Sequence, residues 1–323
     1  DEQFDYMLSN PPFGVDWKKA QKIIKAEHDN KGMQGRFGAG LPRINDGSLL
    51  FLQHMISKMK PSGTRIAVVF NGSPLFSGSA GSGESEIRKW IIENDWLEAI
   101  VAMPDQLFYN TGISTYVWLV NNKKEETRQG KVQLINATGA KDEELISDGK
   151  LEVNRFWKKM DKSLGSKRKE IPENGNTKGI GFINQLYGNF EENEFSKILS
   201  NDYFGYWRVT VEQPLKDENG EIAKSKGKPK ADSKLRDYEN IPFLRTEKDG
   251  NLTPQTIEEY LEREVTPHLP EAWIDEKKTK IGYEINFTKY FYEFKPLRSL
   301  TDIKADILAL EKTSLENQQT VLD

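Results

Sequence analysis

The residues best suited to chemistry lie near the start of the sequence, in the tetrapeptide Asn10-Pro11-Pro12-Phe13. Its two prolines fix φ and remove two backbone N–H donors, so the turn is stiff and its carbonyl oxygens are free to accept hydrogen bonds. The Asn10 side chain adds another carbonyl acceptor, and Phe13 offers a flat apolar face. Two convergent acceptors beside a stacking surface suit a planar group that carries an –NH₂, either an exocyclic amine or an amide.

An amine on an aromatic ring is a poor nucleophile, because its lone pair is delocalised into the ring. Two acceptors that pull on its hydrogens favour a more tetrahedral nitrogen, whose lone pair can attack a methyl sulfonium. Such a reaction depends on positioning and electrostatics and needs no covalent enzyme intermediate. An adenine in a duplex must first be flipped out of the stack to reach such a site. Taken alone, four residues with two prolines are equally typical of a simple turn after a strand.

Alternating strands and helices are expected to position this turn. Residues 4–8 form a short apolar run that the prolines end, which predicts a buried strand. Residues 14–47 are polar and rich in glycine and predict a mobile loop. Ser48 is expected to cap a helix whose apolar residues recur at helical spacing as far as Met59. Residues 65–70 are rich in β-branched side chains and predict a strand.

The same alternation continues along the chain. A loop rich in glycine and serine at residues 77–83 precedes an expected helix at residues 86–93. Strands are predicted at residues 97–102 and 115–120, and they should pair antiparallel because no helix separates them. Residues 131–135 predict one more strand. The pattern indicates an α/β fold with a partial Rossmann-like sheet, a C-terminal antiparallel strand pair, and a mainly helical C-terminal region after it.

The rest of the sequence changes character. Basic residues dominate residues 155–169, which could either track the phosphates of a nucleic acid or form a solvated face. Residues 216–236 are rich in lysine with almost nothing apolar, and they predict a mobile stretch. From Leu297 onward, leucine and isoleucine recur at spacings of three, four and seven, which is typical of a helix that packs on a partner helix.

Composition narrows the classes of protein. The 323 residues contain no cysteine, which excludes disulfides, thiolate metal sites and the cysteine nucleophile that methylation of a cytosine ring carbon needs. His28, His54 and His268 show no ligand spacing, so no metal site is expected. The net charge of −4 does not by itself indicate a nucleic-acid binder. No apolar run approaches the length of a membrane span, and the acidic start is unlike a signal peptide, so we expect a cytoplasmic protein.

Several ordered pieces of the sequence resemble the modification (M) subunit of type I restriction-modification systems, an N6-adenine DNA methyltransferase. Beyond the tetrapeptide and the strand before it, the resemblance rests on residues 65–76, on Glu86-Ile87-Arg88-Lys89 and on residues 107–115. Weaker similarity continues through residues 162–168, 204–206, 210–212, 282–287 and 302–310.

The resemblance implies roles for the site residues. Asn10 and the carbonyl of Pro11 would hold the target amine, Pro12 would stiffen the turn, and Phe13 would stack on the flipped adenine. The substrate-binding residues of the same pocket would be Asn110, Thr111, Gly112 and Thr115. The methyl donor would be S-adenosylmethionine. The partners would be DNA, a specificity (S) subunit that reads the DNA sequence, a restriction (R) subunit and a second M subunit.

The resemblance also implies how the chain is organised. The sheet would be part of an S-adenosylmethionine-dependent methyltransferase fold. We expect three regions: the C-terminal half of the catalytic domain at residues 1–140, a mixed accessory region at 141–296 and a C-terminal helix at 297–323. In the family, a glycine-rich loop and an acidic residue that hold the donor precede the tetrapeptide. Neither occurs in this sequence, and residues 78–83 do not follow a strand in the required way, so we expect an upstream segment to be missing.

Two other classes of function stay open. The same tetrapeptide serves enzymes that methylate RNA amines or the side-chain amide of glutamine in proteins, although the residues beyond 124 suit the type I pattern better. Alternatively, the chain could be a non-catalytic DNA-binding or assembly module, in which the basic run at residues 155–169 would give salt-dependent binding.

We expect the isolated chain to bind S-adenosylmethionine poorly and to be inactive by itself, because the residues that hold the donor in the family have no counterpart here. Titration calorimetry with S-adenosylmethionine measures this directly. A dissociation constant in the micromolar range would contradict the expectation.

Overall fold

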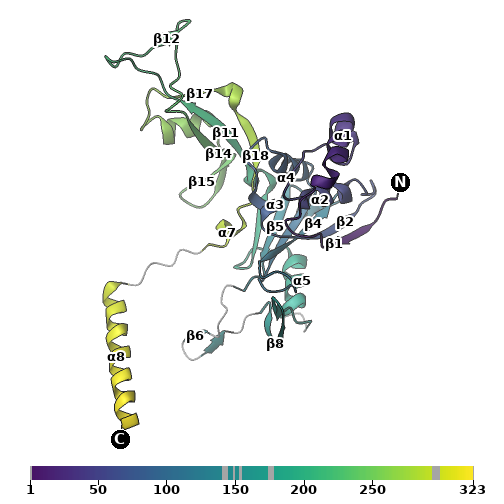
Figure 1. The fold of residues 1–323 in the computed structure, drawn as a ribbon, viewed down its shortest axis with the longest axis vertical. Coiled ribbons are helices and arrows are strands. Elements are labelled where there is room, and N and C mark those ends of the chain that lie inside the picture. The colour runs from purple at the N-terminus through teal and green to yellow at the C-terminus, as the bar shows by residue number, and fades with distance from the viewer. Residues whose placement is uncertain are drawn as a thin grey trace. The chain divides into compact units, whose positions relative to one another are not determined.

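The computed structural model describes residues 2–139, 145–147, 150–152, 155–173, 178–292 and 299–322. The chain divides into two compact units, residues 1–287 and 288–323, called unit 1 and unit 2. Unit 1 is a mixed α/β structure with several sheets (Figure 1). Within the described ranges, no helix combines the length and the apolar character needed to cross a bilayer.

A six-stranded sheet forms the centre of unit 1, in the order β1-β2-β4-β3-β5-β10. Its strands are β1 (Tyr6–Ser9), β2 (Arg65–Phe70), β3 (Leu97–Met103), β4 (Thr115–Asn121), β5 (Lys131–Asn136) and β10 (Ser196–Ser200). β1 is parallel to β2, and β5 is parallel to β3. β4 is antiparallel to β2 and β3, and β10 is antiparallel to β5. The predicted antiparallel pair of β3 and β4 is therefore confirmed, with β4 inserted between β2 and β3.

Strand direction decides which loops meet at each edge of this sheet. Phe70 at the end of β2 pairs with Tyr116 near the start of β4, and Met103 at the end of β3 pairs with Thr115. Because β1 is parallel to β2, the turn after Ser9 lies at the same edge. We call it the carboxyl edge, and its loops are residues 10–13, 71–73 and 104–114.

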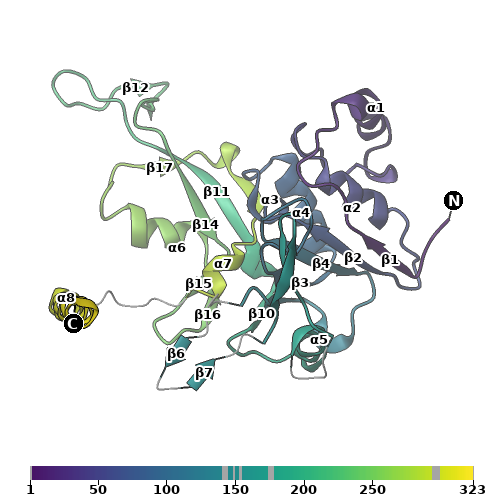
Figure 2. The ribbon, with the colours of Figure 1, turned by 60° about the horizontal axis from the view of Figure 1, so that its bottom comes forward.

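Helices cover both faces of the sheet. Figures 1 and 2 show α2 (Ser48–Ile56) and α4 (Gly83–Glu93) on one face and α5 (Gly179–Asn189) on the other. α5 packs Ile183 and Leu186 against buried residues of β3 and β5. Ser48, which was expected to cap α2, is instead its first residue, and Gly47 holds the cap position without a side-chain hydrogen bond. Asp46 Oδ1 accepts a hydrogen bond from the Ser48 backbone N–H (3.1 Å).

Residues 14–47 have a defined fold, so the prediction of a mobile loop there is wrong. They contain α1 (Gln21–Lys31) between the short 3-10 helices η1 (Lys18–Ala20) and η2 (Gly32–Gln34). Trp17 and Phe37 pack with Leu50 of α2 in a small core. Two large apolar side chains are enough to anchor a segment whose average composition is polar.

β1 is an exposed edge strand, whereas its apolar sequence predicts a buried one. The side chains of Tyr6 and Leu8 are 75% and 83% exposed. The strand pairs on one side only, with β2. Met7 and Ser9, on the other face, are partly buried. An apolar run predicts burial only if further elements cover both faces, and among the described residues the face of Tyr6 and Leu8 is left exposed.

A second sheet lies in the region that was expected to be mainly helical. Its central strand β11 (Gly205–Glu212) is antiparallel to β14 (Asp237–Pro242), β17 (Trp273–Ile274) and β18 (Lys280–Tyr283). The helical prediction is therefore wrong for this part and holds only for α8 (Leu300–Leu322), which lies in unit 2. β17 and β18 have two and four residues and lie far from β11 in the sequence, so no local periodicity indicates that they complete this sheet.

The remaining elements are short. The two-stranded hairpins are β6 (Leu145–Ser147) with β7 (Lys150–Glu152), β8 (Lys158–Leu164) with β9 (Lys167–Glu170), β12 (Lys224–Ser225) with β13 (Lys228–Pro229), and β15 (Leu244–Thr246) with β16 (Leu252–Pro254). The short helices are α3 (Ser73–Phe76), η3 (Glu126–Arg128), η4 (Asn201–Phe204), α6 (Ile257–Tyr260), the π-helix η5 (Leu261–Val265), η6 (Glu276–Lys278) and α7 (Phe287–Tyr290). The β12–β13 hairpin lies within residues 216–236, whose mobility stays a prediction.

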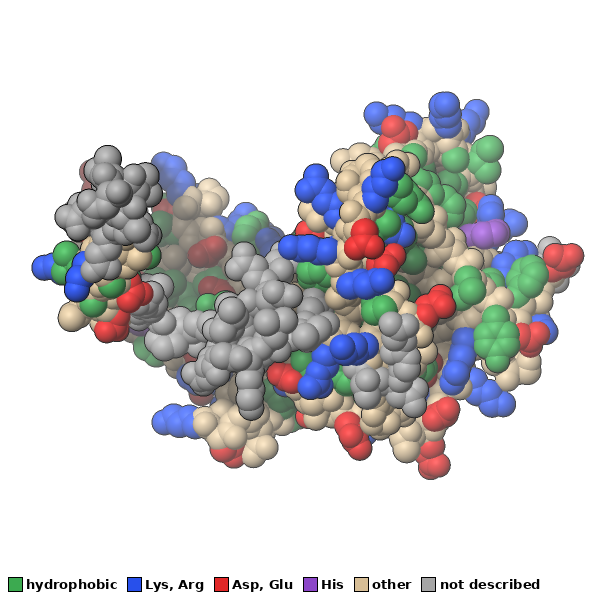
Figure 3. All heavy atoms as spheres, turned by 90° about the horizontal axis from the view of Figure 1, so that it is seen from below, with side chains coloured by type: hydrophobic (Ala, Val, Ile, Leu, Met, Phe, Trp, Pro, Cys, Tyr) green, Lys and Arg blue, Asp and Glu red, His purple; other side chains and the backbone are tan. Residues whose placement is uncertain are grey.

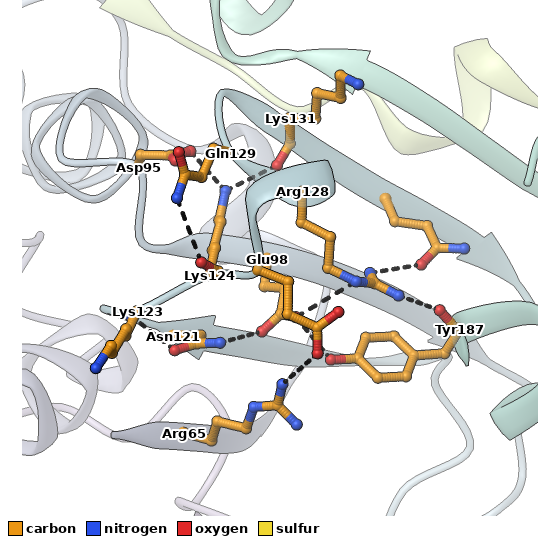
Figure 4. A network of polar contacts seen from close by, with 12 residues as sticks. Arg65, Asp95, Glu98, Asn121, Lys123, Lys124, Arg128, Gln129, Lys131 and Tyr187 are labelled. Carbon is orange, nitrogen blue, oxygen red and sulfur yellow. Dashed lines mark hydrogen bonds and ion pairs between the residues drawn. The ribbon is translucent and has the colours of Figure 1, made fainter. Parts of the chain in front are cut away.

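A buried polar network joins α5 to the six-stranded sheet, which we call the main sheet (Figure 4). The network lies at the edge of this sheet that is opposite the carboxyl edge. Glu98 of β3 is 1% exposed, and it accepts hydrogen bonds from Asn121 Nδ2 (2.9 Å) and from the Tyr187 hydroxyl (2.8 Å). The guanidinium of Arg128 lies 3.7 Å from Glu98 and donates to Gln133 Oε1 (3.1 Å). A buried carboxylate is tolerated because all of these groups pair with it or with one another.

The network predicts how the stability of the protein changes at alkaline pH. Burial, together with Glu98, raises the pKa of Tyr187 from 10.0 to about 12. A folded-state pKa above the unfolded value contributes stability that is complete below pH 10 and is lost as the pH rises through about 12. Replacing Tyr187 with Phe removes this titration, so the free energy of unfolding should fall less steeply across that range than in the wild type.

Urea unfolding at a series of pH values measures this difference. Tyr6→Phe, at an exposed tyrosine, is the matched control and should follow the wild type. An identical pH dependence for Tyr187→Phe and the wild type would refute the assignment.

Candidate functional site at the carboxyl edge

The tetrapeptide forms the turn directly after β1. Asn10 and Pro12 are exposed, Pro11 is buried, and Phe13 is partly buried. Within the described part of the chain, the Asn10 side chain and the Pro11 carbonyl have no hydrogen-bond partner. Both acceptors are therefore available to a group from outside the chain.

Phe13 reaches the loop between β3 and β4. Its ring contacts the ring of Phe108 edge to face, with centroids 6.2 Å apart and planes at 84°. Such a pair is worth about 0.5–1.5 kcal/mol beyond the area that it buries. Phe108 also bridges to Thr111 across the loop. The structure thus brings the tetrapeptide into contact with the loop that leads into the second segment that the sequence indicated, residues 110–115.

The residues of that second segment differ in exposure. Asn110 and Gly112 are exposed, and Thr111 is partly buried and accepts a hydrogen bond from the backbone N–H of Ile113 (3.3 Å). Thr115 is fully buried at the start of β4, and its hydroxyl has no hydrogen-bond partner among the described residues. Buried hydroxyls are normally paired, so the unpaired hydroxyl of Thr115 is the unusual feature of this segment.

Arg43 approaches the same edge from the segment that was expected to be a loop. Its guanidinium donates to Ser73 Oγ and to Ser77 Oγ (3.1 Å for Ser77), and its backbone N–H donates to Glu84 Oε1 (2.8 Å). These residues line a small pocket, together with Pro42, Asp46, Leu49 and Pro74. The guanidinium of Arg43 also lies 3.8 Å from Asp46, three residues along the chain. Its other side-chain partners and Glu84 lie 30 or more residues away, so nothing in the sequence marks Arg43 as a residue of this edge.

Arg88 of α4 is the second residue that the sequence analysis left without a role. It is fully buried, and its guanidinium donates to four backbone carbonyls: those of Tyr283 (2.6 Å), Pro74 (3.0 Å), Ser77 (2.7 Å) and Gly78 (3.2 Å). Burial lowers the pKa of Arg88 to about 10, so it stays charged at neutral pH. One side chain therefore fixes the chain after β2 to α4 and to β18 of the second sheet.

Comparison with known proteins shows which family the sequence matches. A family model described as N-6 DNA Methylase matches residues 1–203. The chain is similar to the type I restriction enzyme MjaIX methylase subunit of Methanocaldococcus jannaschii, with 36% identity over 137 residues, 42% of this chain and 24% of that protein. It is also similar to the HindI methylase subunit of Haemophilus influenzae, with 33% identity over 138 residues, 42% of this chain and 28% of that protein. The chain thus spans about a quarter of these relatives.

Solved structures give a weaker likeness. The methyltransferase subunit of a type I restriction-modification system from Streptococcus thermophilus superposes with a TM-score of 0.45 and 23% identity, over 62% of this chain and 35% of that one. A modification subunit of a putative type I restriction enzyme from Vibrio vulnificus has a TM-score of 0.40 and 17% identity, over 68% and 37% of the two chains.

The contacts of Arg88 predict a large loss of stability when its guanidinium is removed. Replacing Arg88 with Met takes this donor from the buried carbonyls of Pro74 and Tyr283, each at a cost of about 1–3 kcal/mol, and from the less buried carbonyls of Ser77 and Gly78. We expect the free energy of unfolding to fall by about 3 kcal/mol or more, as measured by urea denaturation. Lys89→Met, next to it in α4, is the control and should change stability little. Equal stability of the two variants would contradict the role given to Arg88.

Proposed function

Because the chain belongs to the N-6 DNA methylase family, we propose that it carries the adenine-holding part of a DNA adenine-N6 methyltransferase, the modification subunit of a type I restriction-modification system. The observation that carries this proposal is the position of the tetrapeptide at the carboxyl edge, with Phe13 packed against Phe108. The curated relatives, which are named as type I methylase subunits, support the choice of DNA over RNA or protein.

In this proposal the tetrapeptide holds the flipped adenine by its amine and its ring. The two hydrogens on N6 are donated to the side-chain oxygen of Asn10 and to the carbonyl of Pro11, and the adenine ring stacks on Phe13. Pro12 keeps the turn rigid, so the two acceptors are fixed before the base arrives. Drawing both hydrogens to one side makes N6 more tetrahedral and leaves its lone pair free to attack a methyl group.

The second segment completes the pocket around the base. Asn110, Thr111 and Gly112 line its open side, which their exposure supports. Thr115 contributes a buried hydroxyl at the floor of the carboxyl edge, whose lack of a partner within the described residues is consistent with a ligand contact. Phe108 holds Phe13 edge to face and so limits the rotation of the stacking ring.

S-adenosylmethionine is the methyl donor in this proposal, and when bound it supplies an electrophilic methyl group on a sulfonium. The turn after β2, in the described part of the chain, does not fit it. A donor with a nucleoside is usually held by a glycine-rich turn from a strand into a helix, whereas β2 leads through Gly72 into the four-residue α3. The described residues therefore serve the adenine side of the reaction.

The family likeness also suggests partners and organisation. We propose that the protein acts in the cytoplasm on DNA, together with a specificity subunit, a restriction subunit and a second M subunit. Residues 1–140, which hold five of the six strands of the central sheet, would be the C-terminal half of the catalytic domain with a Rossmann-like methyltransferase sheet. A mixed accessory region at 141–296 and a helix at 297–323 would follow. Exposed apolar side chains on α8, at Leu300, Ile307 and Leu310, support contact of that helix with another subunit.

Asn10→Ala tests the mechanism directly. Loss of one of the two acceptors should lower kcat for adenine methylation by about 10²–10³ with little change in KM, because the interaction strengthens in the transition state. The measurement is transfer of labelled methyl from S-adenosylmethionine to DNA by the native complex that contains this chain, with N6-methyladenine identified by mass spectrometry. Asn219→Ala, at an exposed asparagine in the lysine-rich stretch, is the control. Unchanged kcat for Asn10→Ala would rule the mechanism out.

A further inference from the structure

The β8–β9 hairpin, residues 158–170, is strongly basic in a chain that is acidic overall. Six of its residues are Lys or Arg and two are Asp or Glu, while the chain as a whole has a net charge of −4. Long-range attraction to a polyanion is therefore weak, and local cations decide where a polyanion binds. The position of this hairpin in the fold then determines which part of a polyanion those cations can reach.

The hairpin is attached to the loop between β3 and β4 at the carboxyl edge. The backbone N–H groups of Arg168 and Lys169 both donate to the carbonyl of Gln106 (2.9 and 3.2 Å). Gln106 has a φ of 56°, a conformation that non-glycine residues rarely adopt. Two hydrogen bonds to its carbonyl help to hold this turn in that conformation, and they fix β9 to the loop.

A second attachment lies at the tip of the hairpin. The backbone N–H of Ser166 donates to the carbonyl of Tyr109 (3.1 Å), and Lys167 Nζ lies 5.0 Å from the centre of the Tyr109 ring. Gly165 has a φ of +62° there, and a Cβ added to it would lie 3.2 Å from the Tyr109 carbonyl oxygen. Tyr109 directly follows Phe108, which contacts Phe13. The hairpin and the tetrapeptide therefore hold adjacent residues of one loop.

Two of the cations in the hairpin are used within the fold. Lys169 is buried, and its Nζ lies 2.6 Å from Asp105 Oδ1 and 3.9 Å from the centre of the Trp157 ring. Lys158 pairs with Glu170 at 2.8 Å. These contacts hold the hairpin together and attach it to the loop, and they neutralise the two charges.

Three other cations remain available. Lys159, Lys162 and Arg168 are exposed, and within the described residues none of them forms an ion pair. Figure 3 looks at unit 1 from the side on which β8 and α5 lie in Figure 1, and several Lys and Arg side chains stand out from that face. We refer to Lys159, Lys162 and Arg168 as the hairpin cations.

We propose that the hairpin cations bind the backbone phosphates next to the adenine that the tetrapeptide holds. Phosphate contacts of this kind carry no sequence information, but they fix the register of a strand on a protein. Cations attached to the loop that contains Phe108 and Tyr109 would place those phosphates at a set distance from Phe13. This inference rests on the proposed function, and it adds the part of the surface that holds the strand while the base is out of the helix.

The test compares two triple substitutions in the native complex. One replaces the hairpin cations (Lys159→Gln, Lys162→Gln and Arg168→Gln). The matched control replaces three exposed lysines at the tip of the other lysine-rich hairpin, β12–β13 (Lys224→Gln, Lys226→Gln and Lys228→Gln). All six side chains are exposed, so the urea midpoint should change little in both variants.

The measurement is the affinity for a DNA duplex as a function of salt, by fluorescence anisotropy. Each lost phosphate contact lowers the slope of log K against log salt by about 0.9, so the hairpin variant should lose about 2.7 and the control nothing. KM for DNA should rise in the hairpin variant, while kcat at saturating DNA changes much less.

An unchanged salt slope in the hairpin variant, or an equal loss in the control, would overturn the proposal. So would a loss of affinity that is confined to an RNA duplex. The wild-type methylation assay tests the proposed function separately. If the wild type fails to methylate adenine but the hairpin variant still loses its salt slope, the enzyme assignment fails and the phosphate surface stands.

Discussion

The direction of β4 is the constraint on which the site depends. β4 is antiparallel to both of its neighbours, so its first residue, Thr115, lies at the edge where β1, β2 and β3 end. Had β4 been parallel, a crossover would have carried the preceding loop to the other edge. Instead the chain turns back within residues 104–114 and brings Phe108 to Phe13. One antiparallel strand thus assembles two segments about a hundred residues apart.

The loops at this edge are held by contacts from outside the sheet. Arg88 binds four carbonyls, three of them in the chain that follows β2. The β8–β9 hairpin binds the carbonyls of Gln106 and Tyr109 in the loop before β4. Both supports use backbone carbonyls, so they fix the path of the loop and leave its side chains available for a ligand. A site that must hold a base in one orientation needs such support, because a loop alone is mobile.

Sequence patterns predicted the elements with strong local signals. The β-branched run of β2 and the paired strands β3 and β4 lie close to where they were expected, and the tetrapeptide follows a strand. Features set by distant partners were not predictable: the fold of residues 14–47 depends on Leu50 packing with Trp17 and Phe37, and the second sheet pairs strands far apart in the chain. Arg88 lies in a recognisable segment, but its carbonyl partners are visible only in the fold. The exposure of β1 shows that apolar composition alone does not determine burial.

A double-mutant cycle on Phe13 and Phe108 tests most directly whether the tetrapeptide and the loop before β4 form one site. Phe13→Ala, Phe108→Ala and the double variant are compared through kcat/KM for adenine methylation by the native complex. The edge-to-face contact predicts that the two losses are not additive, with a coupling of about 0.5–1.5 kcal/mol. Additive losses, to within about 0.3 kcal/mol, would mean that the two rings act independently and would contradict a shared site.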